Sequence, residues 1–294
     1  MTYKYKLKLY IVKPMKWLLA IAVTLSSTTQ YPVQVIAQTK QPPTTKQPVQ
    51  PVKTPASPQQ RTSQPVFVWP KTPALSPISG RRVGMGSRDN CPAVATALTA
   101  LVPLQEAQNV GKQRDASVIG IVEGLTISER PTFWFYVPYT RDLADSSAEF
   151  ILQDSAETNI YEKAIALPSQ PGVIGISLPD NVASLEVGKT YRWYLKVRCN
   201  QRTASVPIYV EGDIQRINLD SRVMQQLQTT TDPQEKIVIY AKEGIWFDAL
   251  TMLAKLRLAN SNDASVKKHW QTLLQSVSLD NIATDPLVNS SNGQ

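Results

Sequence analysis

The chain contains one histidine, His269, and two cysteines, Cys91 and Cys199. A typical zinc site needs three or four His or Cys ligands, so this composition argues against one. A Ser-His-Asp or Cys-His catalytic centre would have to use His269. We expect His269 on the exposed face of the last helix, beside Lys267 and Lys268. The sequence therefore predicts no cofactor, no metal site and no nucleophilic centre of these kinds.

Near the N-terminus, the apolar run of residues 17–25 is shorter than the about 20 apolar residues that cross a bilayer. It follows a start with five lysines and no acids, and Val35 and Ala37 supply small side chains ahead of a cleavage site. This pattern predicts a secretory signal peptide over 1–37, and hence export to the periplasm or the extracellular space. No transmembrane segment is expected after cleavage. An uncleaved anchor or a cytosolic amphipathic start is the alternative.

Acidic residues are absent from the first 82 positions. Five lysines lie in 1–37 and seven further Lys and Arg in 38–82, so residues 83–294 carry a net charge of −4, against +8 for the whole chain. Because the excess of basic residues lies in the expected signal and linker, we expect no nucleic-acid binding by the folded part.

Residues 38–82 are rich in Pro, Gln, Thr and Lys, which predicts a disordered linker. Its one apolar island is Val-Phe-Val-Trp at 66–69. We expect this island to dock on the folded domain as an edge strand; a short contact motif is the alternative.

In an exported protein an isolated cysteine pair most simply forms one disulfide, so we expect a Cys91–Cys199 bond. Two buried free thiols are the alternative. Cys91 precedes the first clear strand. The bond would therefore fix the N-terminal segment of the domain rather than join two sheets.

Short apolar or alternating segments, bounded by turn-forming residues, run through the first half of the folded part. They are 117–126, 131–138, 148–154, 159–167, 172–178, 190–199 and 204–217. Seven strands at this spacing predict a mainly β fold, an antiparallel β-sandwich of the immunoglobulin or fibronectin type III kind over 83–217.

Tyr191, at the start of one predicted strand, resembles the tyrosine corner of those sandwiches, in which the Tyr hydroxyl bonds back to the preceding backbone. The period of two then places Tyr191 and Trp193 inward. Arg192, Tyr194 and Lys196 face outward on the same strand.

After residue 217 the apolar period becomes helical. Residues 219–227 predict a short helix, Asp232-Pro233 predicts the start of another, and stripes over 246–256 and 266–277 predict a helical hairpin. We expect 218–278 to form a helical appendage packed on the sandwich and 279–294 to form a frayed tail. Residues 241–250 resemble the centre of a tetratricopeptide repeat, but no second copy occurs.

The strand predicted at 131–138 carries large apolar side chains on both faces. One face must be core, which leaves Trp134 and Tyr136, or Phe133 and Phe135, for another role. Pairing with 190–199, as in immunoglobulin topology, would bring these rings beside cations and allow them to stack on a sugar or hold a protein. The resulting candidate binding face is Trp134, Tyr136, Arg192, Tyr194 and Lys196. The alternative is that the C-terminal helices cover the aromatic rings.

Several stretches of 84–258 carry a family resemblance: Cys91-Pro92, 98–103, 124–139, 148–154, 185–199, 210–216 and 244–250. On these motifs the chain resembles the cyanobacterial exported family "domain of unknown function 928". The resemblance implies export and no known enzyme activity.

Carboxylates are the only plentiful catalytic residue type: Glu123, Glu129, Asp142, Asp145, Glu149, Asp154 and Asp213. A glycosidase needs two of them at a defined distance across a cleft, and we expect most to be solvated. The first functional hypothesis is an exported, non-catalytic protein–protein interaction module of the cell envelope or of a secreted assembly. The second is a carbohydrate- or peptidoglycan-binding module that uses the aromatic sheet face. The third is a carboxylate-dependent glycoside hydrolase.

Overall fold

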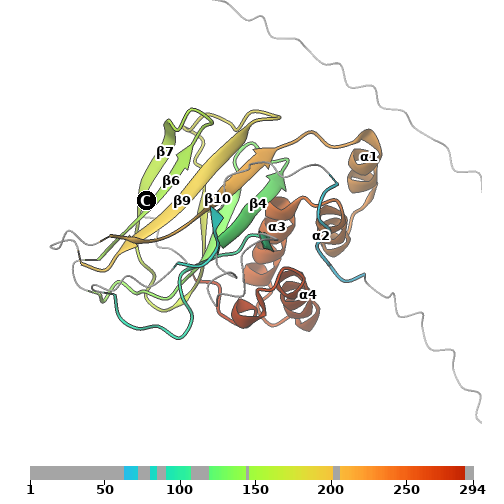
Figure 1. Cartoon of the computed structure of the whole chain (residues 1–294). Coiled ribbons are helices and arrows are strands. Elements are labelled where there is room, and N and C mark those ends of the chain that lie inside the picture. The colour runs from blue at the N-terminus through green and yellow to red at the C-terminus, as the bar shows by residue number, and fades with distance from the viewer. Residues whose placement is uncertain are drawn as a thin grey trace, which may run out of the picture. The chain divides into compact units, whose positions relative to one another are not determined.

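A computed structural model of the chain describes residues 63–71, 80–84, 91–106, 119–143, 146–200 and 206–288 (Figure 1). The expected signal peptide, most of the expected linker and residues 289–294 lie outside these ranges. None of the described helices is long and apolar enough to cross a membrane.

The described strands form two sheets. The larger has the order β3-β4-β1-β10-β9-β6-β7 and the smaller the order β2-β5-β8. The larger sheet contains β3 (Leu104–Glu106), β4 (Ile119–Thr126), β1 (Gly80–Arg81), β10 (Ile208–Arg216), β9 (Thr190–Arg198), β6 (Ser147–Gln153) and β7 (Asn159–Ile165). The smaller contains β2 (Thr99–Ala100), β5 (Thr132–Val137) and β8 (Gly172–Ser177). The pairings are antiparallel, except that β4 and β10 run parallel. The predicted antiparallel sandwich is therefore confirmed.

Aromatic side chains fill the space between the two sheets. Phe133 and Phe135 of β5 face the larger sheet, where Phe135 lies 5.6 Å from Trp193 and Phe133 lies 4.9 Å from Phe150, measured between ring centroids. Trp193 and Phe150 are completely buried. Such tilted and edge-on pairs combine a large buried apolar area with favourable ring geometry, so they fix how the sheets stack.

β9 follows the predicted alternation closely: Tyr191, Trp193, Leu195 and Val197 are buried, while the residues between them are half-buried. The predicted tyrosine-corner bond is also present, because the Glu186 amide donates to the Tyr191 hydroxyl over 2.9 Å. Both features depend on neighbours close in sequence, which is why the sequence predicts them.

The pairing of 131–138 with 190–199, on which the candidate binding face depends, does not occur. β5 pairs with β2 and β8 in the smaller sheet, and β9 pairs with β6 and β10 in the larger. All six residues of β5 are buried, because the strand has the sandwich core on one face and helix on the other. A strand that is apolar on both faces does not indicate which sheet it joins.

In the described part of the chain, four helices follow the strands, and they lie on the β4 side of the larger sheet, away from β7 (Figure 1). They are α1 (Ser221–Thr229), α2 (Pro233–Lys242), α3 (Trp246–Ala259) and α4 (Ala264–Gln275), followed by the short 3₁₀ helix η1 (Asp280–Ile282). Asp220, Asp232 and Asp263 cap α1, α2 and α4 by accepting bonds from backbone amides, as side chains at this position commonly do. The predicted helical part is confirmed, with Pro233 at the start of α2.

The expected tail is packed, not frayed, as far as residue 288. Leu279 and Ile282 are buried under the helices. Further on, the Val288 amide donates to the Val173 carbonyl of β8 over 2.9 Å. The sequence prediction missed this because the apolar residues are too widely spaced to form a helical stripe.

The apolar island at 66–69 docks on the helices. The Phe67 amide donates to Ser276 Oγ and the Val68 amide to the Ala241 carbonyl, both over 3.0 Å. The expected docking is confirmed, but the edge strand is wrong: the island adds to no sheet. Residues 80–81, expected in the linker, form β1 between β4 and β10. The folded part therefore begins before residue 83.

The expected exposure of His269 is wrong, because only 1% of its surface is exposed. His269 lies on α4 beside the buried Trp270, and one turn earlier Ser265 Oγ donates to Gln234, at the start of α2, over 2.8 Å. The neighbours Lys267 and Lys268 are exposed, and their charge was the reason to expect His269 on the same exposed face.

His269 should make the fold sensitive to acid. Neither ring nitrogen has a hydrogen-bond partner among the described residues. Burial lowers the pKa of His269 below 6.5, while Asp232 and Asp263 partly oppose this shift. The unfolded chain thus takes up the proton first, and stability is lost as the pH falls through 6.5.

We expect His269→Leu to flatten this dependence. Between pH 7.5 and 5.5 the free energy of unfolding should fall less in the variant than in the wild type. The difference should be at most about 1.4 kcal/mol, the value of one proton over one pH unit. Urea unfolding at both pH values measures it, and an equal fall in both proteins would contradict this role of His269.

Candidate ligand-binding pocket

A pocket of about 490 Å³ opens where the sandwich meets the helices. The turn between β4 and β5 forms one wall, with Thr126, Ser128 and Pro131, and α2 and α3 form the other. This volume lies within the range of about 300–1,000 Å³ that is typical of small-molecule sites. The strand and helix walls come from distant parts of the chain.

Asp248, the third residue of α3, joins the two walls. Its Oδ2 accepts a hydrogen bond from the Thr126 hydroxyl over 2.8 Å and one from the Ile127 amide over 3.1 Å. Burial raises the pKa of Asp248, and these hydrogen bonds partly oppose that shift. Since Asp248 also lies in the first turn of a helix, the positive end of the helix dipole favours its charged form.

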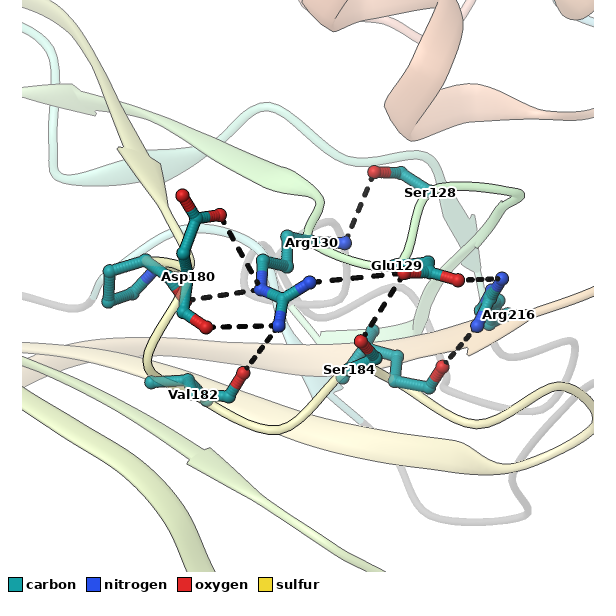
Figure 2. A network of polar contacts seen from close by, with 9 residues as sticks. Ser128, Glu129, Arg130, Asp180, Val182, Ser184 and Arg216 are labelled. Atoms are coloured by element: carbon teal, nitrogen blue, oxygen red, sulfur yellow. Dashed lines mark hydrogen bonds and ion pairs between the residues drawn. The ribbon is translucent and has the colours of Figure 1, made fainter. Parts of the chain in front are cut away.

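A network of polar contacts holds the turn wall in place (Figure 2). The Arg130 guanidinium donates to the Pro179, Asp180 and Val182 carbonyls over 3.0 to 3.3 Å. Arg216, on β10, donates to Glu129 over 3.0 Å. The turn is thereby fixed to the loop between β8 and β9 and to the end of β10.

The helix wall is anchored from beneath by buried tryptophans. Trp134 Nε1 donates to the Thr251 hydroxyl over 3.0 Å, and Trp246 Nε1 donates to the Leu101 carbonyl over 2.8 Å. The Phe247 ring lies 5.5 Å from that of Phe133. α3 therefore presents its pocket-facing side chains from a firmly packed backbone.

The lining combines apolar side chains with few polar groups. Phe247, Met252 and Leu256 supply apolar surface, and Tyr240 adds an aromatic ring with a hydroxyl. Burial, together with the charge of Asp248, raises the pKa of Tyr240, so the phenol stays protonated at neutral pH. Lys255 is exposed at the rim.

Among the residues that the structure describes, Asp248 is the only carboxylate that lines this pocket. A standard glycosidase uses two carboxylates, whereas this described lining offers one. Of the seven acids singled out in the sequence, of which most were expected to be solvated, Glu123 and Asp213 are buried in the larger sheet. Asp145 lies outside the described residues. No group of three or more His, Cys, Asp or Glu side chains in the described part of the chain is placed to hold a metal ion.

The structure separates the predicted binding face into two parts. Trp134 and Tyr136 are only 6% and 7% exposed, and Trp134 lies against α3, so the predicted aromatic sheet face does not exist. The alternative expectation, coverage by the C-terminal helices, is correct for Trp134. Arg192, Tyr194 and Lys196 do lie together on the outer face of β9, with the Lys196 ammonium 5.4 Å from the centre of the Tyr194 ring.

Arg192 is engaged within that outer face. Its guanidinium lies 3.1 Å from a Glu211 carboxylate oxygen and 3.4 Å from one of Asp213, both on β10. The guanidinium thus serves contacts between neighbouring strands. The three outer-face residues lie on β9, in a different sheet from Trp134 and Tyr136.

The expected disulfide between Cys91 and Cys199 is present. It connects the segment that leads to β2 with the residue that follows β9, and so fixes the N-terminal segment as predicted. The bond encloses the strands of the sandwich from β2 to β9 in one covalent loop.

The family model of Domain of Unknown Function DUF928 matches residues 83–287. This match covers most of the chain. The chain belongs to the DUF928 family. The matched region includes both cysteines, the helices and every residue that lines the pocket. A comparison with curated proteins finds no match.

Asp248 was missed as a site residue, although it stands within one of the DUF928 motifs, 244–250. The sequence feature that could have pointed to Asp248 is its position between Trp246-Phe247 and Ala249-Leu250, as the one acid in an otherwise apolar helix start. An acid at such a position must find partners on the element against which the helix packs. The sequence did not reveal that this element is the end of β4.

Proposed function

We propose that the protein is an exported, non-catalytic binding module that recognises a partner protein of the cell envelope or of a secreted assembly. The observation that carries the proposal is the pocket of about 490 Å³ between the β4–β5 turn and α3, whose described lining is mainly apolar and includes one carboxylate. Such a pocket suits one or two inserted side chains of a partner, because anchors of protein interfaces commonly fill desolvated pockets.

Two observations support export. The Cys91–Cys199 bond is of a kind that persists in oxidising compartments outside the cytosol. The lysine-rich start and short apolar run of residues 1–25 have the composition of a signal peptide.

Site-specific photocross-linking of the full chain in the producing cell tests the proposal. A photoreactive residue at Lys255 stands on the pocket rim, and one at Ala164, on the remote edge strand β7, serves as the control position. We expect a discrete cross-linked polypeptide from position 255 and none from position 164.

A pair of matched substitutions shows whether that cross-link depends on the pocket. Leu256→Trp places a larger ring in the lining, whereas Leu258→Trp makes the same change on the exposed side of α3. The cross-link should disappear with Leu256→Trp and persist with Leu258→Trp. A cross-link that both variants retain, or that position 164 gives equally, would overturn the proposal.

A further inference from the structure

The pocket contains a carboxylate whose charge has no cationic partner. No Lys, Arg or His among the described residues forms an ion pair with Asp248, although Asp248 is only partly exposed to solvent. Both hydrogen bonds from the turn end on Oδ2, so Oδ1 takes neither of them. A carboxylate partly withdrawn from water and without a counter-charge is costly, and a bound cation would reduce that cost.

We propose that the pocket receives a cationic side chain of the partner protein, lysine or arginine, whose charged group pairs with Asp248. This inference rests on the proposed function of the pocket. It adds the chemical class of the group that enters: a positive charge at the end of an apolar stem.

Neither of the two cationic side chains in the described pocket lining pairs with Asp248, so a cation from a partner can do so. Arg130 lines the pocket, but its guanidinium donates to three main-chain carbonyls of the loop between β8 and β9 and is held there. Lys255 is exposed and forms no ion pair with Asp248. Neither neutralises the carboxylate, so the pocket keeps a negative site behind a positively charged rim.

The remaining lining fits a long cationic side chain. Met252 and Leu256 offer apolar surface to a methylene stem, as proteins commonly do for the stems of Lys and Arg. Tyr240 adds a partly exposed aromatic ring, and the faces of such rings attract cations. An anionic ligand would meet Asp248 as a like charge, and a neutral one would leave it unpaired.

A purely structural role of Asp248, the joining of α3 to the turn, predicts no preference for cations. The variant Asp248→Asn separates the two roles, because its amide oxygen still accepts from Thr126 and Ile127 while the negative charge is lost. Thermal unfolding of the variant verifies that it is folded.

Three probes of equal length test the proposal on the full mature chain: n-hexylammonium, 1-hexanol and hexanoate. Binding is followed by NMR of ¹³C-labelled methionine methyl groups. Met252 lines the pocket, and the exposed Met224 on α1 is the internal control. We expect hexylammonium to bind at least tenfold more tightly than hexanol and hexanoate to bind most weakly, with shifts at Met252 and none at Met224.

In Asp248→Asn the preference for hexylammonium over hexanol should fall to within twofold. Equal binding of hexylammonium and hexanol to the wild type would overturn the cation inference and leave the pocket as a binding site. No shift of Met252 with any probe would count against the proposed function itself. The wild-type comparison decides the matter even where Asp248→Asn does not fold.

Discussion

Replacement of both Cys91 and Cys199 by serine is expected to lower the free energy of unfolding by about 4 to 5 kcal/mol. The bond joins residues separated by 108 positions, and in the chain-entropy model a loop of that length restricts the unfolded chain by this amount. Since a domain is typically stable by only about 5–15 kcal/mol, the variant should be close to unfolding at physiological temperature.

Urea unfolding of the oxidised wild type and of the double variant measures this loss. Reduced wild type is the matched control, because it lacks the bond but keeps both sulfur atoms, and it should resemble the double variant. A loss below about 1 kcal/mol would mean that the bond closes a loop already held together in the unfolded chain. That result would contradict the stabilising role given to the disulfide.

Trp246→Ala is expected to cost about 3–5 kcal/mol, as is typical when a fully buried aromatic side chain is deleted. Trp246 is 0% exposed, and its ring lies 5.3 Å from that of Phe67. Its indole N–H also donates to the Leu101 carbonyl, which the substitution leaves without this donor. The side chain thus joins α3, the segment before β3 and the docked island at 66–69.

Two control variants divide this cost. Trp246→Phe keeps a ring and loses the hydrogen bond, so about 1–3 kcal/mol should be lost. Trp69→Ala removes the same side chain from a position that is 39% exposed, and should cost less than about 1 kcal/mol. Chemical unfolding gives all three values. An equal loss from Trp69→Ala and Trp246→Ala would contradict the packing described for α3.

The sequence predicted those parts of the fold that depend on near neighbours. The alternation along β9, the Tyr191–Glu186 bond and the cap of α2 each involve residues a few positions apart. Their chemistry is therefore visible in a short window of sequence. The disulfide was also predictable. In the expected oxidising compartment cysteines form disulfides, and with only two cysteines in the sequence each has the other as its partner.

Features that depend on distant contacts were not predictable in this way. β5 is apolar on both faces, and its pattern is the same whether its partner is β8 or β9. His269 is buried by tertiary packing, which the sequence of its own helix does not reveal. The pocket depends on a contact between Thr126 and Asp248, which lie 122 residues apart, so no local motif announces it.

The central claim is that the pocket between the β4–β5 turn and α3 is where the partner protein binds. The most direct test is the dissociation constant of the cross-linked partner for the wild type, Leu256→Trp and Leu258→Trp, measured by calorimetry. We predict that Leu256→Trp weakens binding at least tenfold, about 1.4 kcal/mol, and that Leu258→Trp stays within twofold of the wild type. Equal affinities of all three proteins would contradict the claim.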